Sequence, residues 1–251
     1  YIVSSHLERD HSSAIPAIMK YCPNATIYAS QPHGVKGLTA YYGEYKYQGV
    51  KTGDEISIGS RRLQFLTTPM LHWPDSMITY CPEEKILFSN DAFGQHLAAS
   101  SPFDDDNDFA IVMEEAKKYY ANILNPFSTF VTKKLEEIGS LNIPIDMIAP
   151  SHGVIWRDKP MQIVEKYAQW AQDYQEDQLT IVYDTMWEGT TRLAHAIAEQ
   201  AGKLSPDTEV KVFNISKTDK NEIMTEVLKS RAIAVGSPTV SSTILSSVAG
   251  W

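Results

Sequence analysis

Two imidazoles and two carboxylates lie within a stretch of six residues near the start of the chain. They belong to His6, Glu8, Asp10 and His11, and they follow a Tyr-Ile-Val-Ser stretch that is typical of a β-strand. A loop at the end of a strand can direct alternate side chains at one point, as metal binding requires. Packing alone rarely gathers four ionisable groups so closely, because each would lose its hydration beside the others. The cluster therefore predicts a metal site.

Three further candidate ligands occur later in the chain, each beside the expected end of a strand. His72 lies in Pro-Met-Leu-His-Trp-Pro-Asp, Asp91 in Phe-Ser-Asn-Asp-Ala-Phe-Gly, and His152 in Ala-Pro-Ser-His-Gly. With the first cluster they make four imidazoles and three carboxylates, too many for one tetrahedral zinc ion. Such a set suits two metal ions that share a bridging carboxylate and leave positions open for a substrate. Imidazole and carboxylate without thiolate fit iron, manganese or zinc and disfavour copper(I).

Taken alone, any histidine of this chain would more often be a structural or surface residue than a metal ligand, so the prediction depends on the whole set. Three histidines stay outside it. We expect His33 in a loop and His195 on the solvated face of a helix. His96 closely follows the strand that ends at Asp91, and there it could either be a surface residue or contact one of the metal ligands.

The seven candidates form an ordered set that resembles the metal-binding residues of metallo-β-lactamase-like domains. Hydrolases of that superfamily usually carry His-x-His-x-Asp-His and bind zinc, whereas Glu8 stands here in place of the second histidine. That substitution is the version found in the flavodiiron protein family. The segments Thr-Pro-Met-Leu-His-Trp-Pro-Asp-Ser-Met and Ser-His-Gly-Val-Ile-Trp-Arg are also similar to that family, especially to its nitric-oxide-reducing flavorubredoxins.

The resemblance implies a division of the ligands between two iron ions. His6, Glu8 and His72 would hold one iron, Asp10, His11 and His152 would hold the other, and Asp91 would bridge them. An anionic oxygen from Glu8 favours iron, including its ferric state. The ligation by His11 is the least secure, because the matching residue turns away from the metal in some members of the family.

A second motif follows a predicted strand at Leu179–Tyr183. The loop Asp-Thr-Met-Trp-Glu-Gly-Thr-Thr leads into a helix, whose N-terminal N–H groups and dipole can bind a phosphate. The loop lacks the Gly-Lys-Ser/Thr motif of nucleotide-hydrolysing loops, and it also lacks the Gly-x-Gly-x-x-Gly motif of dinucleotide-binding folds. It resembles the flavodoxin loop that binds the FMN phosphate, and the later Gly-Ser-Pro-Thr-Val segment would touch the isoalloxazine ring. A threonine-rich turn can also serve only as a helix cap. The expected FMN contacts are Thr185, Met186, Trp187, Glu188, Gly189, Thr190, Ser237, Pro238 and Thr239.

The elements that must position these groups fall into two patterns. Up to about Trp156, short β-type runs alternate with loops and helices; the runs are Ala25–Ala29, Glu55–Ile58, Leu63–Thr67, Met77–Tyr80 and Lys85–Ser89. Helices are predicted at Phe109–Leu124, Thr129–Leu141 and Pro160–Gln175. The polar run Gln172–Gln178 indicates a domain boundary, and a regular β-α-β-α-β pattern follows it.

We therefore expect a chain of mixed α/β and α+β class with two domains. Residues 1–177 would form a metallo-β-lactamase-like αββα sandwich that carries the metals. Residues 178–251 would form a flavodoxin-like doubly wound parallel sheet that binds FMN and is incomplete, since it holds three of the usual five strands. The chain begins without Met and stops just after the start of a helix, so we expect both ends to be cut.

Composition limits the partners of the chain. A net charge of −9 and a pI of about 5.2 oppose binding of nucleic acid or anionic lipid. The apolar stretches are too short to span a membrane, and the first residues do not resemble a secretory leader, so we do not expect secretion. Cys22 and Cys81 are far apart and in no metal-ligand spacing. These features suggest a protein of the reducing cytoplasm.

The resemblance implies an oxidoreductase, a flavodiiron nitric oxide or oxygen reductase. It would reduce nitric oxide to nitrous oxide, or dioxygen to water, at a diiron site supplied with electrons by FMN. It further implies rubredoxin or a similar electron donor and a head-to-tail homodimer. The main alternative is a dizinc metallo-hydrolase with a flavodoxin-like tail. An electron carrier that uses only the flavodoxin half and an inactive copy are two others.

Overall fold

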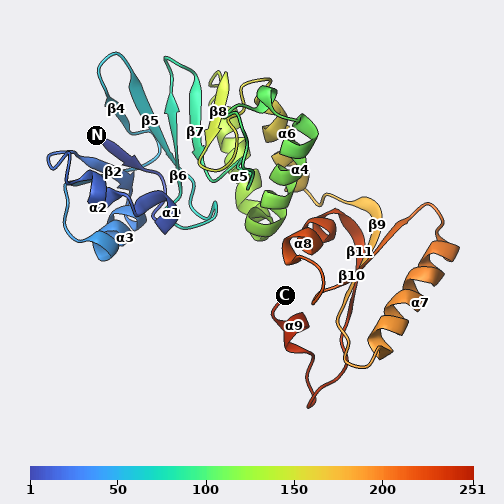
Figure 1. Ribbon diagram of the computed structural model, residues 1–251. Helices are drawn as coiled ribbons and strands as arrows, with labels where there is room; N and C mark the ends of the chain where they lie inside the picture. Colours follow the sequence, from blue (N-terminus) through green and yellow to red (C-terminus); the bar gives the residue numbers. More distant parts are fainter. The chain divides into compact units, whose positions relative to one another are not determined.

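The computed structural model describes all residues, 1–251, and the chain divides into two compact units, Tyr1–Gln172 and Asp173–Trp251 (Figure 1). The predicted boundary, between residues 177 and 178, falls inside strand β9 (Glu176–Tyr183). The polar run there is not a solvated linker, because Gln178 is buried and its amide donates to the Thr180 and Ser230 hydroxyls. No helix is both long and apolar enough to cross a membrane.

The N-terminal unit contains two β-sheets. One is parallel, with the strand order β1 (Ile2–Ser4), β2 (Ile27–Ser30), β3 (Tyr47–Val50). The other has five strands in sequence order: β4 (Glu55–Ser57), β5 (Arg62–Thr67), β6 (Met77–Cys81), β7 (Ile86–Asn90) and β8 (Met147–Pro150). Its pairs are antiparallel except for β7 and β8, which run parallel.

The two sheets pack face to face, as the alternation of side chains along β2 shows. Tyr28 points between the sheets, where its ring stacks on Phe65 of β5 with centroids 6.0 Å apart. Ile27 and Ala29 point the other way and pack with Leu38 of helix α3 (His33–Tyr42). Successive residues of a strand face opposite sides, so one strand serves both the inner and the outer core. This arrangement is the predicted αββα sandwich.

The remaining helices of this unit are short or lie beside the five-stranded sheet. Short helices α1 (Arg9–Ser12) and α2 (Ile15–Ile18) follow β1. Figure 1 shows the others grouped beside β7 and β8; they are α4 (Phe109–Tyr119), a π-helical turn (Tyr120–Leu124), α5 (Ser128–Ser140) and α6 (Met161–Trp170). Two 3-10 turns, Asp104–Asp106 and Asn125–Phe127, complete the unit.

Several predicted elements differ from the structure. The helix predicted to reach Gln175 ends at Trp170, and α3, β3 and β8 were not predicted. The expectation of a loop at His33 was wrong, because His33 begins α3. Gly34, which suggested a turn, allows α3 to approach the sheet: a Cβ there would lie 2.9 Å from Ser30 Oγ.

The C-terminal unit is a three-stranded parallel sheet with helices on both faces. Its order is β10 (Glu209–Asn214), β9, β11 (Ser230–Gly236). Ile181 and Tyr183 of β9 pack against Ala194 of α7 (Gly189–Leu204). Val182, between them, packs on the opposite face against Ile223 of α8 (Lys220–Lys229). A short helix, α9 (Ser246–Ala249), ends the chain, and the whole is the predicted doubly wound arrangement.

Candidate functional site

The seven predicted metal ligands converge on one point of the N-terminal unit. Each comes from a strand end or the residues just after one: β1 precedes His6, Glu8, Asp10 and His11, β5 precedes His72, β7 precedes Asp91, and β8 precedes His152. The parallel pairing of β7 and β8 brings Asp91 and His152 to the same edge of the sheet. The fold therefore brings together side chains that are up to 146 positions apart, from His6 to His152.

One half of the cluster surrounds the Oδ2 atom of Asp91. The Nε2 atoms of His6 and His72 each lie 3.6 Å from this oxygen. The Glu8 Oε2 atom lies 3.2 Å from His6 Nε2 and 3.5 Å from His72 Nε2. Two imidazole nitrogens and two carboxylate oxygens thus face one another at the spacing of ligands around a single metal ion.

The other half surrounds the second oxygen of the same carboxylate. His11 Nε2 lies 3.0 Å and His152 Nε2 lies 3.3 Å from Asp91 Oδ1. Asp10 Oδ2 lies 3.4 Å from the His11 nitrogen and 3.3 Å from the His152 nitrogen. Asp91 therefore presents one oxygen to each donor set, as a bridging carboxylate does. The ring of His11 faces the cluster rather than solvent.

Unsatisfied buried polar atoms indicate that the cluster is suited to a bound cation. Both carboxylate oxygens of Asp91 and the Nε2 atom of His11 are buried, and the contacts between them do not have hydrogen-bond geometry. A buried carboxylate without hydrogen bonds is costly unless a cation neutralises it. The donor set of four imidazoles and three carboxylates fits a pair of divalent or trivalent ions, so the residues present fit the expected metals.

The pKa values of the cluster respond to the same surroundings. Burial opposes charge on the rings of His6 and His11, but the carboxylates beside them raise both pKa values. For His72 burial dominates and lowers the pKa. Burial also disfavours the charged form of Asp91, yet contacts with the His11 and His152 rings hold its pKa well below the usual range. The rings of His6 and His11 therefore hold a proton more readily than a free imidazole does.

The cluster has a closed end and an open end. The side chains of His6 and Asp91 are 0% and 1% exposed, whereas those of Glu8 and Asp10 are 38% and 51% exposed. Since a substrate must enter from solvent, we take the side of the cluster bearing Glu8 and Asp10 as its approach. The buried pair, His6 and Asp91, would fix the position of bound metal ions.

Asp75 is a functional residue that the sequence analysis missed. This buried carboxylate accepts from the backbone N–H of Leu7 at 2.7 Å, and its Oδ1 atom lies 3.1 Å from His6 Nδ1. The contact leaves Nε2 of His6 to face the metal positions, as a carboxylate beside a ligand histidine commonly does. Its signal was an aspartate three positions after His72, inside a segment already recognised as similar to the family.

The three remaining histidines lie outside the donor set. His195 is exposed on α7, as predicted, and His33 begins α3. His96 is exposed, and its ring lies 5.7 Å from that of His152 and 4.8 Å from that of Tyr119. It is therefore a neighbour of one candidate ligand.

The predicted FMN loops line a cavity of about 490 Å³ at the end of β9 in the C-terminal unit. Predicted residues that line it are Thr185, Met186, Trp187, Gly189, Thr190, Pro238 and Thr239, and Val240 and Ser241 join them. Two predicted residues do not line it. Glu188 precedes the first turn of α7 and has a φ of 60°. The hydroxyl of Ser237 accepts a hydrogen bond from the backbone N–H of Leu245.

A carboxylate fixes the start of the first loop. Asp184 accepts from the Thr185 N–H at 2.8 Å, from the Ser216 hydroxyl at 2.6 Å, and from the Ser247 hydroxyl at 2.5 Å. Burial works against its charge, but these donors lower its pKa. The Oγ1 atom of Thr185 is buried without a hydrogen-bond partner, and Trp187 is 85% exposed. An unpartnered hydroxyl in the loop that leads into a long helix suits an anionic ligand.

Comparison with known proteins places this chain among recognised families. Residues 1–153 match the family described as ODP family beta lactamase. The chain is 49% identical over 247 residues to a nitric oxide reductase of Moorella thermoacetica, an alignment that covers 98% of this chain and 61% of the relative. It is 46% identical over 253 residues to an anaerobic nitric oxide reductase flavorubredoxin of an Enterobacter strain, covering 100% and 52%. The chain thus spans between half and two thirds of the length of these relatives.

Solved structures agree with the sequence matches. A rubredoxin oxygen:oxidoreductase from Desulfovibrio gigas superposes with a TM-score of 0.94 at 36% identity, over 100% of this chain and 63% of that one. The flavodiiron protein of Giardia intestinalis superposes with a TM-score of 0.91, also at 36% identity, over 100% and 61%. The predicted resemblance and fold class are confirmed: the chain resembles flavodiiron proteins over its whole length and belongs to the family described as ODP family beta lactamase.

Proposed function

We propose that this chain forms the catalytic part of an oxidoreductase that reduces nitric oxide, dioxygen or both at a pair of iron ions supplied with electrons by FMN. The observation that carries the proposal is the placement of Asp91, whose two oxygens each face a separate set of imidazole and carboxylate donors. When bound, the flavin would deliver electrons, and the iron pair would bind the gas and reduce it.

We assign the candidate ligands of this chain to two iron ions. His6, Glu8 and His72 would hold one iron, and Asp10, His11 and His152 would hold the other. The buried Asp91 would hold both ions, while the exposed side at Glu8 and Asp10 would leave room for a small ligand. Three carboxylates in the set favour iron over a thiolate-binding metal.

The flavin would bind in the C-terminal unit. The N–H groups that begin α7 and the free hydroxyl of Thr185 suit its phosphate, and the exposed indole of Trp187 offers a surface for the ring. Asp184 would act through the loop by holding the backbone of Thr185 in place.

The names of the relatives support both substrates. Two of them are called nitric oxide reductases, and a structural neighbour is called a rubredoxin oxygen:oxidoreductase. By this likeness we propose a rubredoxin or similar protein as the electron donor, a head-to-tail homodimer and a cytoplasmic location. Glu8 and the flavin loop argue against the alternative of a dizinc hydrolase.

Gas consumption tests the proposal directly. The purified chain, reconstituted anaerobically with iron and FMN, would be given a chemically reduced donor and then nitric oxide or dioxygen at an electrode. We expect consumption of at least one gas, and loss of that activity in Asp91→Asn. Ester or lactam hydrolysis by a zinc-loaded chain, without gas consumption by the iron-loaded one, would move the protein to the hydrolases.

A further inference from the structure

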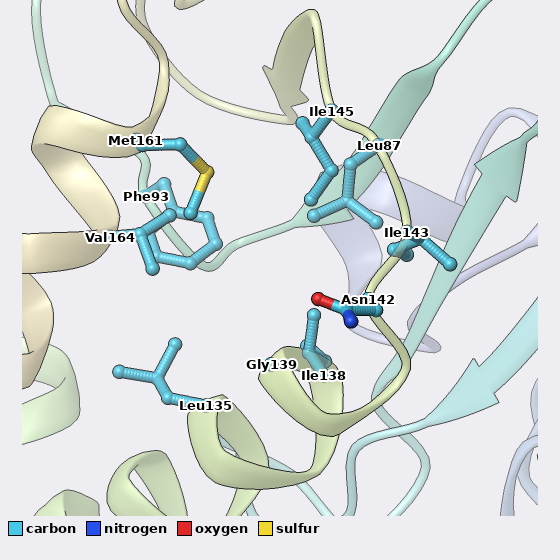
Figure 2. A pocket seen from close by; sticks show the side chains of 10 residues that line it. All are labelled: Leu87, Phe93, Leu135, Ile138, Gly139, Asn142, Ile143, Ile145, Met161 and Val164. Atoms are coloured by element: carbon cyan, nitrogen blue, oxygen red, sulfur yellow. The ribbon is translucent and has the colours of Figure 1, made fainter.

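The donor set has two halves that share Asp91, and this shared residue is anchored alike for both. Phe93 follows it in the same turn, and the Phe93 N–H donates to the Tyr167 hydroxyl at 2.8 Å. Figure 2 shows the Phe93 side chain in a pocket that Leu87 and Leu135 also line. Both oxygens of Asp91 belong to this one anchored turn, so a difference between the halves must come from their other ligands.

The other six candidate ligands divide equally, with two imidazoles and one carboxylate in each half. The Glu8 half consists of His6, Glu8 and His72, whose side chains are 0%, 38% and 19% exposed. The Asp10 half consists of Asp10, His11 and His152, whose side chains are 51%, 12% and 27% exposed. The carboxylate is the more exposed in the Asp10 half, and so is each ring when the rings are compared in order of burial. Water and salt therefore weaken the attraction for a cation more in the Asp10 half.

A carboxylate outside the donor set supports only the Glu8 half. The Oδ1 atom of Asp75 lies 3.1 Å from Nδ1 of His6, and its Oδ2 atom accepts from the Leu7 N–H at 2.7 Å. The Ser30 hydroxyl donates to the Asp75 carbonyl at 2.6 Å and so holds this residue in its turn. A ligand histidine that is oriented before the metal arrives loses less freedom when the metal binds.

The rings of the Asp10 half have no such support. The Nε2 atoms of His11 and His152 contact the carboxylates of the donor set, and neither ring forms a hydrogen bond outside it. His152 lies instead beside the rings of His96 and Tyr119, with centroids 5.7 and 6.0 Å away. Ring packing restrains His152 without selecting the nitrogen that faces the metal position.

Charge favours the Glu8 half as well. A cation there would face Glu8 and Asp91. A third carboxylate, that of Asp75, lies behind the His6 ring and is 2% exposed, so water screens its charge little. A cation in the Asp10 half would face Asp10 and Asp91 without a third carboxylate behind either ring. The Glu8 half therefore offers one more poorly screened negative charge.

We propose that the two metal positions have unequal affinities: the Glu8 half takes the first ion, and the Asp10 half fills second and loses its ion first. The proposal rests on the proposed function, because it takes the donor set as a centre for two metal ions. Since that function needs both ions, occupancy of the Asp10 half would set the fraction of active chains at a given supply of iron. Metal supply would thus regulate the centre through its weaker half.

Cobalt(II) is the probe that locates the first ion, because it accepts the same imidazole and carboxylate donors as iron(II). The purified metal-free chain would be equilibrated with one equivalent of cobalt(II) and crystallised, and anomalous scattering would locate the metal. We expect strong density in the Glu8 half and weak or no density in the Asp10 half. Equal density in both halves, or stronger density in the Asp10 half, would overturn the proposal. Absence of cobalt from both halves would contradict the metal centre itself.

A matched pair of variants tests the order in solution. Glu8→Gln and Asp10→Asn each remove one negative charge from a partly exposed side chain, so neither leaves a fully buried group without a partner. Even a partner outside the donor set is worth about 10- to 100-fold in metal affinity, so Glu8→Gln should weaken the tighter of the two binding steps by at least about tenfold. Asp10→Asn should leave the tighter step unchanged and weaken or abolish the second.

Calorimetric titration with cobalt(II) measures both steps. An equal or larger loss at the tighter step in Asp10→Asn would overturn the order of filling. These measurements need neither flavin nor gas, so they are separate from the test of the proposed function. A chain that fills its halves in this order but consumes no gas when loaded with two irons and flavin would contradict the proposed function and leave the unequal affinities standing.

Discussion

The Oδ1 atom of Asp75 lies 3.1 Å from the Nδ1 atom of His6, and this contact decides which ring nitrogen faces the candidate metal centre. With Nδ1 directed at the carboxylate, Nε2 points to Glu8 and Asp91. The same carboxylate holds the Leu7 backbone at the start of the ligand loop. Asp75 therefore positions a ligand without belonging to the donor set.

Replacing Asp75 should weaken metal binding while leaving every donor in place. In Asp75→Asn the side-chain amide can turn its NH2 group toward His6. The His6 ring then no longer prefers the tautomer that carries its proton on Nδ1. We expect an affinity for iron lower by about 10- to 100-fold, the usual effect of removing such a partner. Competition with a chelator of known affinity measures it. Asp54→Asn is the control, because Asp54 also accepts from a backbone N–H but contacts no ring; equal losses in both variants would contradict the assignment.

Replacing Asp91 should lower the iron content of the chain more than replacing any ligand that contacts only one metal ion. Asp91→Asn removes the negative charge that both donor sets share. The amide that replaces it has only one oxygen, so it cannot offer one oxygen to each metal ion. We expect the iron content to fall from two ions per chain to one or none, while His72→Asn retains more iron than Asp91→Asn. Metal analysis after desalting distinguishes the two. Retention of two irons by Asp91→Asn would show that the carboxylate does not bridge.

Acidity should change the stability of the metal-free chain and of the metal-bound chain in opposite directions. The pKa values of His6 and His11 are raised above the ordinary value of 6.5 in the folded chain. Their contribution to stability without metal is therefore fully present below about pH 6.5 and is lost as the pH rises through the raised values. Metal binding displaces these protons, so it strengthens with rising pH.

Melting temperatures with and without iron check this. We expect the gap between the two forms to widen from about pH 6 to about pH 8. His195→Gln, in an exposed residue of the other unit, should keep the trend, whereas His11→Gln should reduce it. A gap that stays constant over this range would contradict the linkage.

The flavin loop makes an independent prediction at Thr185. Its buried hydroxyl has no partner in the chain, so Thr185→Val should not destabilise the flavin-free protein. The loss of a hydrogen bond to a phosphate should weaken FMN binding by about tenfold or more. Titration of flavin fluorescence measures the affinity, and Thr208→Val, at a hydroxyl that contacts Asp177, is the control. Unchanged affinity in Thr185→Val would remove this hydroxyl from the site.

The donor set was predictable because its residues are chemically unusual in their spacing. Two imidazoles and two carboxylates between His6 and His11 indicate a metal site without knowledge of the fold, and the β-α-β-α-β pattern after residue 178 indicates the parallel sheet. Asp75 was missed for the opposite reason. A single aspartate carries no spacing signal, and its role depends on how the segment after β5 folds back onto β1.

Element boundaries failed where tertiary packing overrides local preference. The glycines and proline around His33 suggest a loop, yet the helix forms because Gly34 fits closely against the sheet and Leu38 is buried. Strand β8 is too short to stand out in the sequence and is specified by its pairing with β7. The pocket lined by Leu87, Phe93 and Leu135 could not be predicted, since a gap in side-chain packing leaves no pattern in a sequence.

The central claim is that Asp91 joins two metal ions, and the magnetism of the reconstituted centre tests it most directly. The chain would be loaded anaerobically with two equivalents of iron-57, oxidised, and examined by Mössbauer spectroscopy in an applied field. We expect two high-spin ferric ions coupled antiferromagnetically to a diamagnetic ground state, with the coupling lost in Asp91→Asn. Uncoupled paramagnetic iron, or one iron per chain in the wild type, would contradict it.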